Sequence, residues 1–223
     1  MIKKCSETLP DFEYYIKGQN PKLLIHSGTH GDEYEVIDFV RKAVEKYENL
    51  LPDFLFVPVV SPSAVGARKR FNGNGKDLNR VFFSDSTEVE VQENIKILDG
   101  HNFDLVVSFH EDPETHDYYI YDEGQRGDIS QKVLNHIKLL EKNSITLLNG
   151  FDDPNDPHLG HEFKDGYLKF DHSFVNEPDG TVTLWVYTEK KTKGILVPEI
   201  PGKETLNKKE FIVDSFFKEI LCQ

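Results

Sequence analysis

The chain has few sulfur-containing residues and no long apolar run. Cys5 and Cys222 are its only cysteines and lie near opposite ends, so neither belongs to a CxxC-type zinc site. Because the termini of a domain often lie close together, a disulfide between them is conceivable, but two free thiols are the expected state. No stretch of about 18 consecutive apolar residues occurs, so no transmembrane helix is expected.

Positive charge is also scarce, because 26 Lys and Arg stand against 39 Asp and Glu, a net charge of −13. Phosphate contacts need clustered basic residues, so we expect no nucleic-acid partner. Hydrophobic residues make up 38% of the 223, enough to fill the core of a single domain over residues 1–223. Lys3 and Lys4 are followed by no apolar stretch, which predicts a cytoplasmic protein rather than a secreted one.

Predicted strands and helices alternate along the chain. Short apolar or alternating runs predict strands at residues 12–16, 22–26, 54–60, 104–109, 118–121 and 195–200. Apolar residues spaced three and four apart predict helices at 32–47, 89–98, 129–140 and 210–221. Pro198 would suit an edge strand or a strand end. The alternation predicts an α/β three-layer sandwich, with a central mixed, mostly parallel twisted sheet flanked by helices.

Three stretches are harder to interpret. Residues 61–87, rich in Gly, Asn and charge, are expected to form a long functional loop. Residues 150–180 mix Asp, Pro, His and Gly and could form an excursion that walls a pocket. Residues 181–193 are ambiguous, because β-branched residues favour a strand while the Lys-rich end before Gly194 favours the end of a helix.

A histidine and a glutamate occur together where a strand is predicted to pass into a helix. His30 and Glu33 stand at positions i and i+3, so their side chains can converge on one ion, and Gly31 would allow a tight turn between them. The alternative is that Asp32 and Glu33 only stabilise the positive end of the helix, with His30 in a loop.

His110 ends an apolar run, which places it at the rim of the sheet where the active sites of α/β proteins lie. Two imidazoles and one carboxylate form the ligand set of catalytic zinc sites, which keep a fourth position for water. The sequence therefore predicts a metallohydrolase with one Zn²⁺ on His30, Glu33 and His110. Asp104, Glu111 and Asp112 could hydrogen-bond the ligand imidazoles, although His110 could also be an ordinary core histidine.

The segment 68–80 carries several basic residues in an acidic chain. A guanidinium can hold a carboxylate through two parallel hydrogen bonds or stabilise an oxyanion, so Arg68, Arg70 and Arg80 are candidates for binding an anionic group. Asn79 adds a neutral donor beside Arg80. The alternative is a solvated basic loop.

The order of these motifs resembles the zinc carboxypeptidase family, particularly its compact bacterial branch and the related succinylglutamate desuccinylase/aspartoacylase group. The motifs span residues 24–201 and are His30-Gly-Asp-Glu33, Arg70-Phe-Asn, Asp77-Leu-Asn-Arg80, Phe109-His-Glu-Asp112, Tyr118-Tyr-Ile-Tyr121 and Val197-Pro-Glu199-Ile-Pro201. The resemblance again makes His30, Glu33 and His110 the zinc ligands.

The resemblance also implies roles for the other residues. Glu199 would act as general base and then general acid. Arg70 would stabilise the oxyanion, with Arg68 as a rival because the length of this loop varies. Asn79 and Arg80 would bind the terminal carboxylate of the substrate.

Two features depart from the larger members of the family. Their substrate-capping tyrosine has no secure counterpart here, and Tyr167 and Tyr187 are candidates that also suit simple packing. The chain is short for a digestive-type carboxypeptidase, which argues against general protein digestion. Four further histidines are not expected to be metal ligands: His116, His158, His161 and His172.

Small peptides are the favoured substrates, because the tyrosine-rich run after His110 resembles the peptidases. N-acyl amino acids are the alternative. A non-catalytic protein that binds zinc or a carboxylate, and a purely structural domain, are rival interpretations from other classes. No membrane partner is expected, and the sequence leaves the oligomeric state open.

Overall fold

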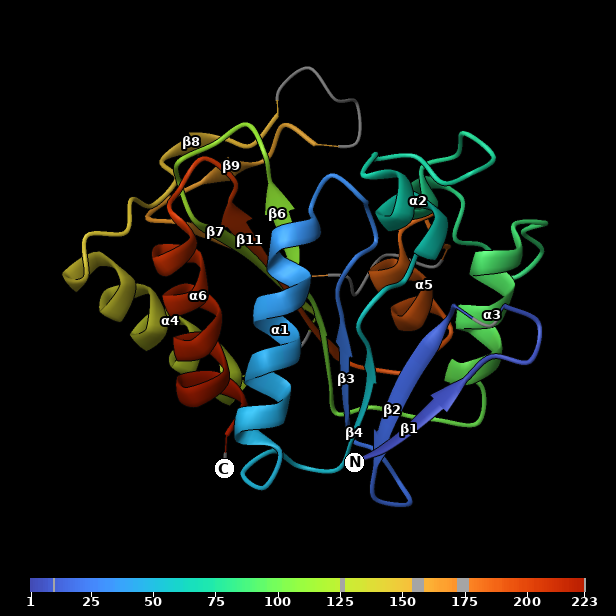
Figure 1. Cartoon of the computed structure of the whole chain (residues 1–223). Coiled ribbons are helices and arrows are strands. Elements are labelled where there is room, and N and C mark those ends of the chain that lie inside the picture. The colour runs from blue at the N-terminus through green and yellow to red at the C-terminus, as the bar shows by residue number, and fades with distance from the viewer. Residues whose placement is uncertain (10, 125–126, 154–158, 172–176, 223) are drawn as a thin grey trace.

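The computed structural model describes residues 1–9, 11–124, 127–153, 159–171 and 177–222 (Figure 1). Within them, nine strands form one mixed sheet in the order β1-β2-β4-β3-β5-β11-β7-β10, with β6 paired to β11. The strands of this sheet are β1 (Ile2–Cys5), β2 (Glu13–Lys17), β3 (Leu23–His26), β4 (Phe54–Val57), β5 (Leu105–Ser108), β6 (His110–Asp112), β7 (Tyr119–Gly124), β10 (Tyr167–Phe170) and β11 (Gly194–Pro201). Strands β8 (Gly150–Phe151) and β9 (Glu162–Phe163) form a separate antiparallel pair.

The centre of the sheet is parallel. Strands β4, β3, β5 and β11 run in one direction, β6 runs parallel to β11, and β10 runs parallel to β7. Antiparallel pairing occurs between β1 and β2, β2 and β4, and β7 and β11. The predicted mixed, mostly parallel sheet is therefore confirmed.

Helices cover both faces of the sheet. They are α1 (Tyr34–Tyr47), α2 (Pro62–Ala67), η1 (Leu78–Arg80), α3 (Val89–Leu98), α4 (Gly127–Lys142), α5 (Val182–Thr188), α6 (Leu206–Phe216) and η2 (Phe217–Leu221). Figure 1 shows α1, α4 and α6 on one side of the sheet, with α3 and α5 on the other. Leu23 and Ile25 of β3 pack in the core beneath α1, α4 and α6, whereas Leu24 packs in the core beneath α3 and α5. This period-two alternation produces the predicted three layers.

The uncertain segments take definite structures. Residues 61–87 are not one continuous loop, because Pro62 begins α2 at a position where its missing N–H costs no hydrogen bond, and η1 follows. The ambiguous segment forms helix α5, whose first turn is capped by the Thr181 hydroxyl accepting from Leu184 N–H. The last helix begins at Leu206, four residues before its predicted start, and ends in the π-helical turn η2.

The expectation for Pro198 was wrong, because β11 is an interior strand paired on both sides. On one side β11 pairs first with β5, through Ile195 and Leu196, and then with β6 from Glu199 onward. Pro198 falls between these two pairing segments, at the break between β5 and β6. There the N–H of Phe109 donates to the carbonyl of His26. A residue without an N–H is tolerated at such an interruption.

Both cysteines are free thiols, with Cys5 exposed and Cys222 half-buried. Among the described residues, no helix combines the length and the apolar character needed to cross a bilayer.

Candidate active site

The predicted metal ligands come together at the carboxyl end of the parallel strands. Glu33 stands immediately before α1, in the connection that leaves β3, and His110 opens β6. All three side chains are buried, and one ligand atom from each of His30, Glu33 and His110 lies within 4.8 Å of the others. Glu33 and His110, which are 77 positions apart in the sequence, thus meet because β3 and β5 are adjacent parallel strands that end at the same edge of the sheet.

Gly31 has a different purpose from the one predicted. It is not among the residues with positive φ, but a Cβ there would stand 1.9 Å from the carbonyl oxygen of Ala64 in α2. The N–H of Gly31 also donates to Lys69 O at 2.9 Å. The glycine therefore allows the loop that carries His30 to lie directly against the backbone of α2.

The donor atoms face one another across the space an ion would occupy. The Nδ1 atom of His30 contacts Glu33 Oε1, and the Nδ1 atom of His110 lies 3.0 Å from Glu33 Oε2. The two imidazole rings are 5.2 Å apart between centroids. Each ligand is thus oriented with its Nδ1 or carboxylate toward a common point.

The outer nitrogens of the two imidazoles have their own partners. His30 Nε2 lies 3.1 Å from Asp77 Oδ1, and His110 Nε2 lies 3.3 Å from Ser108 Oγ. Such contacts fix the tautomer and the ring orientation of metal-ligating histidines. The sequence predicts other residues for this purpose, and Asp77 stands there only within the Asp77-Leu-Asn-Arg80 motif.

None of the three acidic residues predicted as imidazole partners hydrogen-bonds a ligand imidazole through its side chain. Asp104 is exposed, and Asp112 accepts from the Tyr119 hydroxyl at 2.9 Å. Glu111 contributes its main chain, because its N–H donates to Glu33 Oε2 at 3.2 Å. The carboxylate of Glu111 instead binds Lys209.

The electrostatics of the ligand set suit a cation. Burial by itself would lower the pKa of His30, but the Glu33 charge and hydrogen bonds to Asp77 and Glu33 outweigh it and raise the pKa to about 9. Burial opposes ionisation of Glu33, yet the two histidines lower its pKa well below its ordinary value. A field that stabilises positive charge between these side chains would stabilise a divalent ion there, so the residues present fit a metal ion.

Arg70 reaches this centre and Arg68 does not. Arg70 contacts Asp77 Oδ2 through Nε and through a terminal nitrogen, both at 2.9 Å. Arg68 is exposed, with its guanidinium 4.4 Å from the centroid of the Tyr34 ring. Of these two arginines, Arg70 therefore lies nearer the predicted metal ligands.

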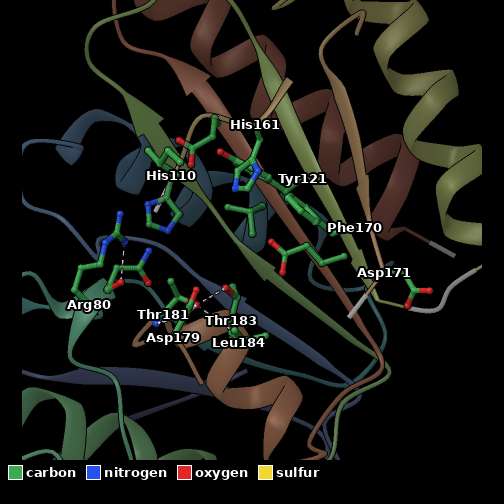
Figure 2. A pocket seen from close by; sticks show the side chains of 15 residues that line it. Arg80, His110, Tyr121, His161, Phe170, Asp171, Asp179, Thr181, Thr183 and Leu184 are labelled. Carbon is green, nitrogen blue, oxygen red and sulfur yellow. Dashed lines mark hydrogen bonds between the residues drawn. The ribbon is translucent and has the colours of Figure 1, made fainter. Parts of the chain in front are cut away.

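Glu199, Asn79 and Arg80 line one cavity of about 400 Å³ together with His110 (Figure 2). Asn79 and Arg80 belong to η1, and Glu199 lies on β11 opposite His110 of β6. Burial raises the pKa of Glu199 well above 4.5, and the charges of Glu33 and Asp112 add to this while Arg70 opposes it. The site thus disfavours the ionised form of the Glu199 carboxyl group.

The segment 150–180, predicted as a possible pocket wall, does supply part of the lining. Its described members in the cavity are Leu159, His161, Phe170, Asp171 and Asp179. From the neighbouring segment, Thr181, Thr183 and Leu184 also line it.

Neither candidate tyrosine is in the lining. The Tyr167 hydroxyl donates to Asp122 at 2.7 Å, and Tyr187 packs against the core beneath α3 and α5. Tyr121 does line the cavity, with its hydroxyl on Asp152.

Of the histidines not expected to be ligands, His116 is exposed and His161 lies in the cavity wall. His158 and His172 lie outside the described residues.

Comparison with known families gives one match. The sequence model described as the succinylglutamate desuccinylase/aspartoacylase catalytic domain matches residues 19–158, which is more than half of the chain. A search of curated proteins found no match.

Solved structures share the fold at low sequence identity. A protein from Shewanella amazonensis, provisionally named a metallopeptidase, has a TM-score of 0.72 and 18% identity, over 98% of this chain and 85% of its own. A metallo-carboxypeptidase from Pseudomonas aeruginosa, solved with (2-guanidinoethylmercapto)succinic acid, has a TM-score of 0.65 and 14% identity, over 99% and 63%. An aspartoacylase family protein from Mesorhizobium loti has a TM-score of 0.56 and 21% identity, over 95% and 62%. These similarities confirm the expected fold.

Proposed function

Because the chain belongs to the succinylglutamate desuccinylase/aspartoacylase family of hydrolases, we propose that it is a zinc-dependent metallocarboxypeptidase acting on small peptides. In this proposal one Zn²⁺ is held by His30, Glu33 and His110. The enzyme cleaves the amide bond next to a residue that bears a carboxylate.

One observation carries the proposal. The buried three-ligand set opens, through His110, into the same cavity that contains Glu199, Asn79 and Arg80. A structural metal site would be closed by a fourth protein ligand, and among the described residues the cluster has three. When bound, the ion would supply Lewis-acid polarisation of the carbonyl and a lowered pKa for water.

The carboxylate end of the substrate would be held by η1. The N–H of Val182 donates to Asn79 Oδ1 at 3.2 Å, which orients the amide so that its NH₂ group can donate on the other side. Arg80 Nη1 donates to the carbonyl of Asn79 at 2.9 Å, which fixes the guanidinium beside that amide. A neutral donor and a charged donor therefore stand side by side for one carboxylate.

Glu199 would transfer the proton. Burial raises its pKa above that of an ordinary glutamate, which makes it a stronger base, so it can accept a proton from the attacking water and return it to the leaving amine. Arg70, which is anchored on Asp77 beside His30, would donate to the oxygen that becomes negative during attack. These roles fit the geometry because Arg70 is anchored on the same Asp77 that contacts His30, while Glu199, Asn79 and Arg80 line the cavity together with His110.

The second candidate is a deacylase of N-acyl amino acids, which the name of the matching family favours. We favour the peptidase because Arg80 is the only Lys or Arg among the described lining residues, and the other charged ones are carboxylates. An N-acyl dicarboxylate would need a second positive group. The ligand named in the Pseudomonas aeruginosa structure, a succinic acid derivative, is consistent with a carboxylate-binding site in this fold.

The deciding experiment combines metal analysis with a substrate comparison. We expect about one zinc per chain, lost in His30→Ala and His110→Ala. We expect hydrolysis of hippuryl-type peptides to exceed that of N-acetyl and N-succinyl amino acids. Faster turnover of the N-acyl substrates would select the deacylase.

Glu199→Gln distinguishes an enzyme from a binding protein. The hydrolase predicts that the variant keeps its zinc and its fold but loses turnover, because only the proton-transfer group has been removed. A non-catalytic binding protein would keep its biological activity in this variant. Protein that contains no stoichiometric metal would contradict the zinc hydrolase and would favour a purely structural domain.

A further inference from the structure

The cavity has a second end, away from the ligand set. Tyr121 and Glu123 of β7 point to the same face of the sheet as Val197 and Glu199 of β11, since residues two apart in a strand share a face. In Figure 2, Arg80 and Asp171 lie on opposite sides of the cavity. The carboxylate-binding residues therefore occupy one end, and the end of β10 occupies the other.

The charged residues at this second end are all negative. Glu123 pairs in register with Phe170 of β10, and Asp171 follows directly. Asp179 also lines the cavity, but it lies beside Thr181 on the side of Arg80 (Figure 2). Among the described lining residues, no Lys or Arg accompanies Glu123 and Asp171 at the second end. Whatever local contacts they make, their summed field there disfavours an anionic group and favours a cationic one.

Aromatic rings lie beside these carboxylates. The rings of Tyr121 and Phe170 are stacked at 6.2 Å between centroids, and His161 meets Phe170 edge-on at 4.7 Å. The faces of such rings attract ammonium and guanidinium groups, while their edges accommodate the aliphatic part of a long side chain.

The strand register gives the separation between Glu199 and Glu123, two residues of the cavity wall. Glu199 is paired with Tyr119 and Glu123 with Ile195, so Glu199 and Glu123 stand four residues apart along the strands. At about 3.3 Å per residue, this separation is roughly 13 Å. An extended lysine or arginine side chain covers roughly half of it, and contacts of about 3 Å at each end account for much of the rest.

We propose that the second end of the cavity receives a positively charged substrate side chain, an amine or guanidinium, with Glu123 as its principal partner. This rests on the proposed function, because that function places the scissile bond at Glu199 and the terminal carboxylate at Arg80. The preferred substrate is then a peptide whose last residue is basic.

The test uses two peptides that differ only in the charge of the last side chain. Hippuryl-arginine and hippuryl-citrulline have the same shape, but citrulline is neutral. We expect kcat/KM for the arginine peptide to exceed that for the citrulline peptide by about tenfold or more, since a charged hydrogen bond is lost. Glu123→Gln should reduce this ratio severalfold. Glu162→Gln, an exposed acid of β9 outside the lining, is the matched control and should leave the ratio unchanged.

A binding measurement separates this inference from the proposed function. Titration calorimetry of the zinc-loaded Glu199→Gln protein with L-arginine and with L-citrulline reports the charge preference without turnover. Tighter binding of arginine that is weakened by Glu123→Gln would support the inference even if no peptide were hydrolysed. Hydrolysis of both peptides at similar rates, or equal binding of both amino acids, would overturn it.

Discussion

Lys209 joins three elements beneath the ligand set. Its ammonium donates to Glu111 Oε1 at 2.7 Å and to Glu35 Oε2 at 2.5 Å, and its side chain is only 2% exposed. Glu111 Oε2 accepts from the N–H of Val36 at 3.3 Å, while the N–H of Glu111 donates to Glu33. Lys209 of α6 thereby holds the start of α1 and strand β6 together at Glu33.

We expect Lys209→Met to lower the free energy of unfolding by about 3 kcal/mol at pH 7. Methionine keeps nearly the same length but leaves the Glu111 carboxylate buried without its cation. Burial already raises the pKa of Glu111 above 4.5, against the opposing effect of Lys209. Without Lys209 this carboxyl would take up a proton in the folded state. At pH 7, about 2.5 units above its ordinary pKa of 4.5, holding that proton costs about 3.4 kcal/mol.

The loss should depend on pH in a definite direction. At pH 5 the solution is only about 0.5 pH unit above the unfolded-state pKa of the carboxyl, so the cost of protonating it in the folded state falls to about 0.7 kcal/mol. Because the folded-state pKa of Glu111 is raised, the deficit disappears below 4.5, where both states are protonated, and grows as the pH rises toward 7.

Urea unfolding of the metal-free protein at pH 5 and pH 7 measures this effect. Lys208→Met is the control, because Lys208 forms a partly exposed pair with Glu204 and should cost less than about 1 kcal/mol. Adding Glu111→Gln to Lys209→Met removes the buried charge and should restore most of the loss. A deficit at pH 7 below about 1 kcal/mol, or one of equal size at both pH values, would refute the reasoning.

Three further outcomes test the site and the core. Asp77→Asn should weaken zinc binding about 10- to 100-fold by releasing His30, and unchanged affinity in a chelator competition would exclude this role. Arg70→Gln should lower kcat by about 100-fold or more, whereas Arg80→Gln should mainly raise KM; the same kinetic change in both would contradict their assignments. Burial lowers the pKa of His136 to about 4 in the folded protein. As the pH falls, this histidine therefore takes up a proton in the unfolded protein before it does so in the folded one. Stability should then drop by about 2 kcal/mol between pH 7 and pH 5, and His136→Gln should abolish this contribution in urea titrations.

Much of the fold and the meeting of the three candidate metal ligands could be predicted from local sequence. The spacing of His30 and Glu33 and the place of His110 after an apolar run are short-range patterns, and neighbouring parallel strands bring such strand-end residues to one edge. The three layers also followed from local periodicity, because residues such as Leu23 and Leu24 must face opposite cores.

Contacts between distant segments could not be predicted in this way. Asp77 becomes the partner of His30, and Arg70 rather than Arg68 reaches it, only because α2 and η1 pack beside the start of α1. An interior strand accommodates Pro198 because the pairing partner of β11 changes from β5 to β6 at this position. The linear sequence thus determined which side chains could bind a metal ion, since that depends on residue type and local spacing. Tertiary packing alone decided which residues orient those ligands and which carboxylates close the far end of the cavity, because these partners meet through non-local contacts.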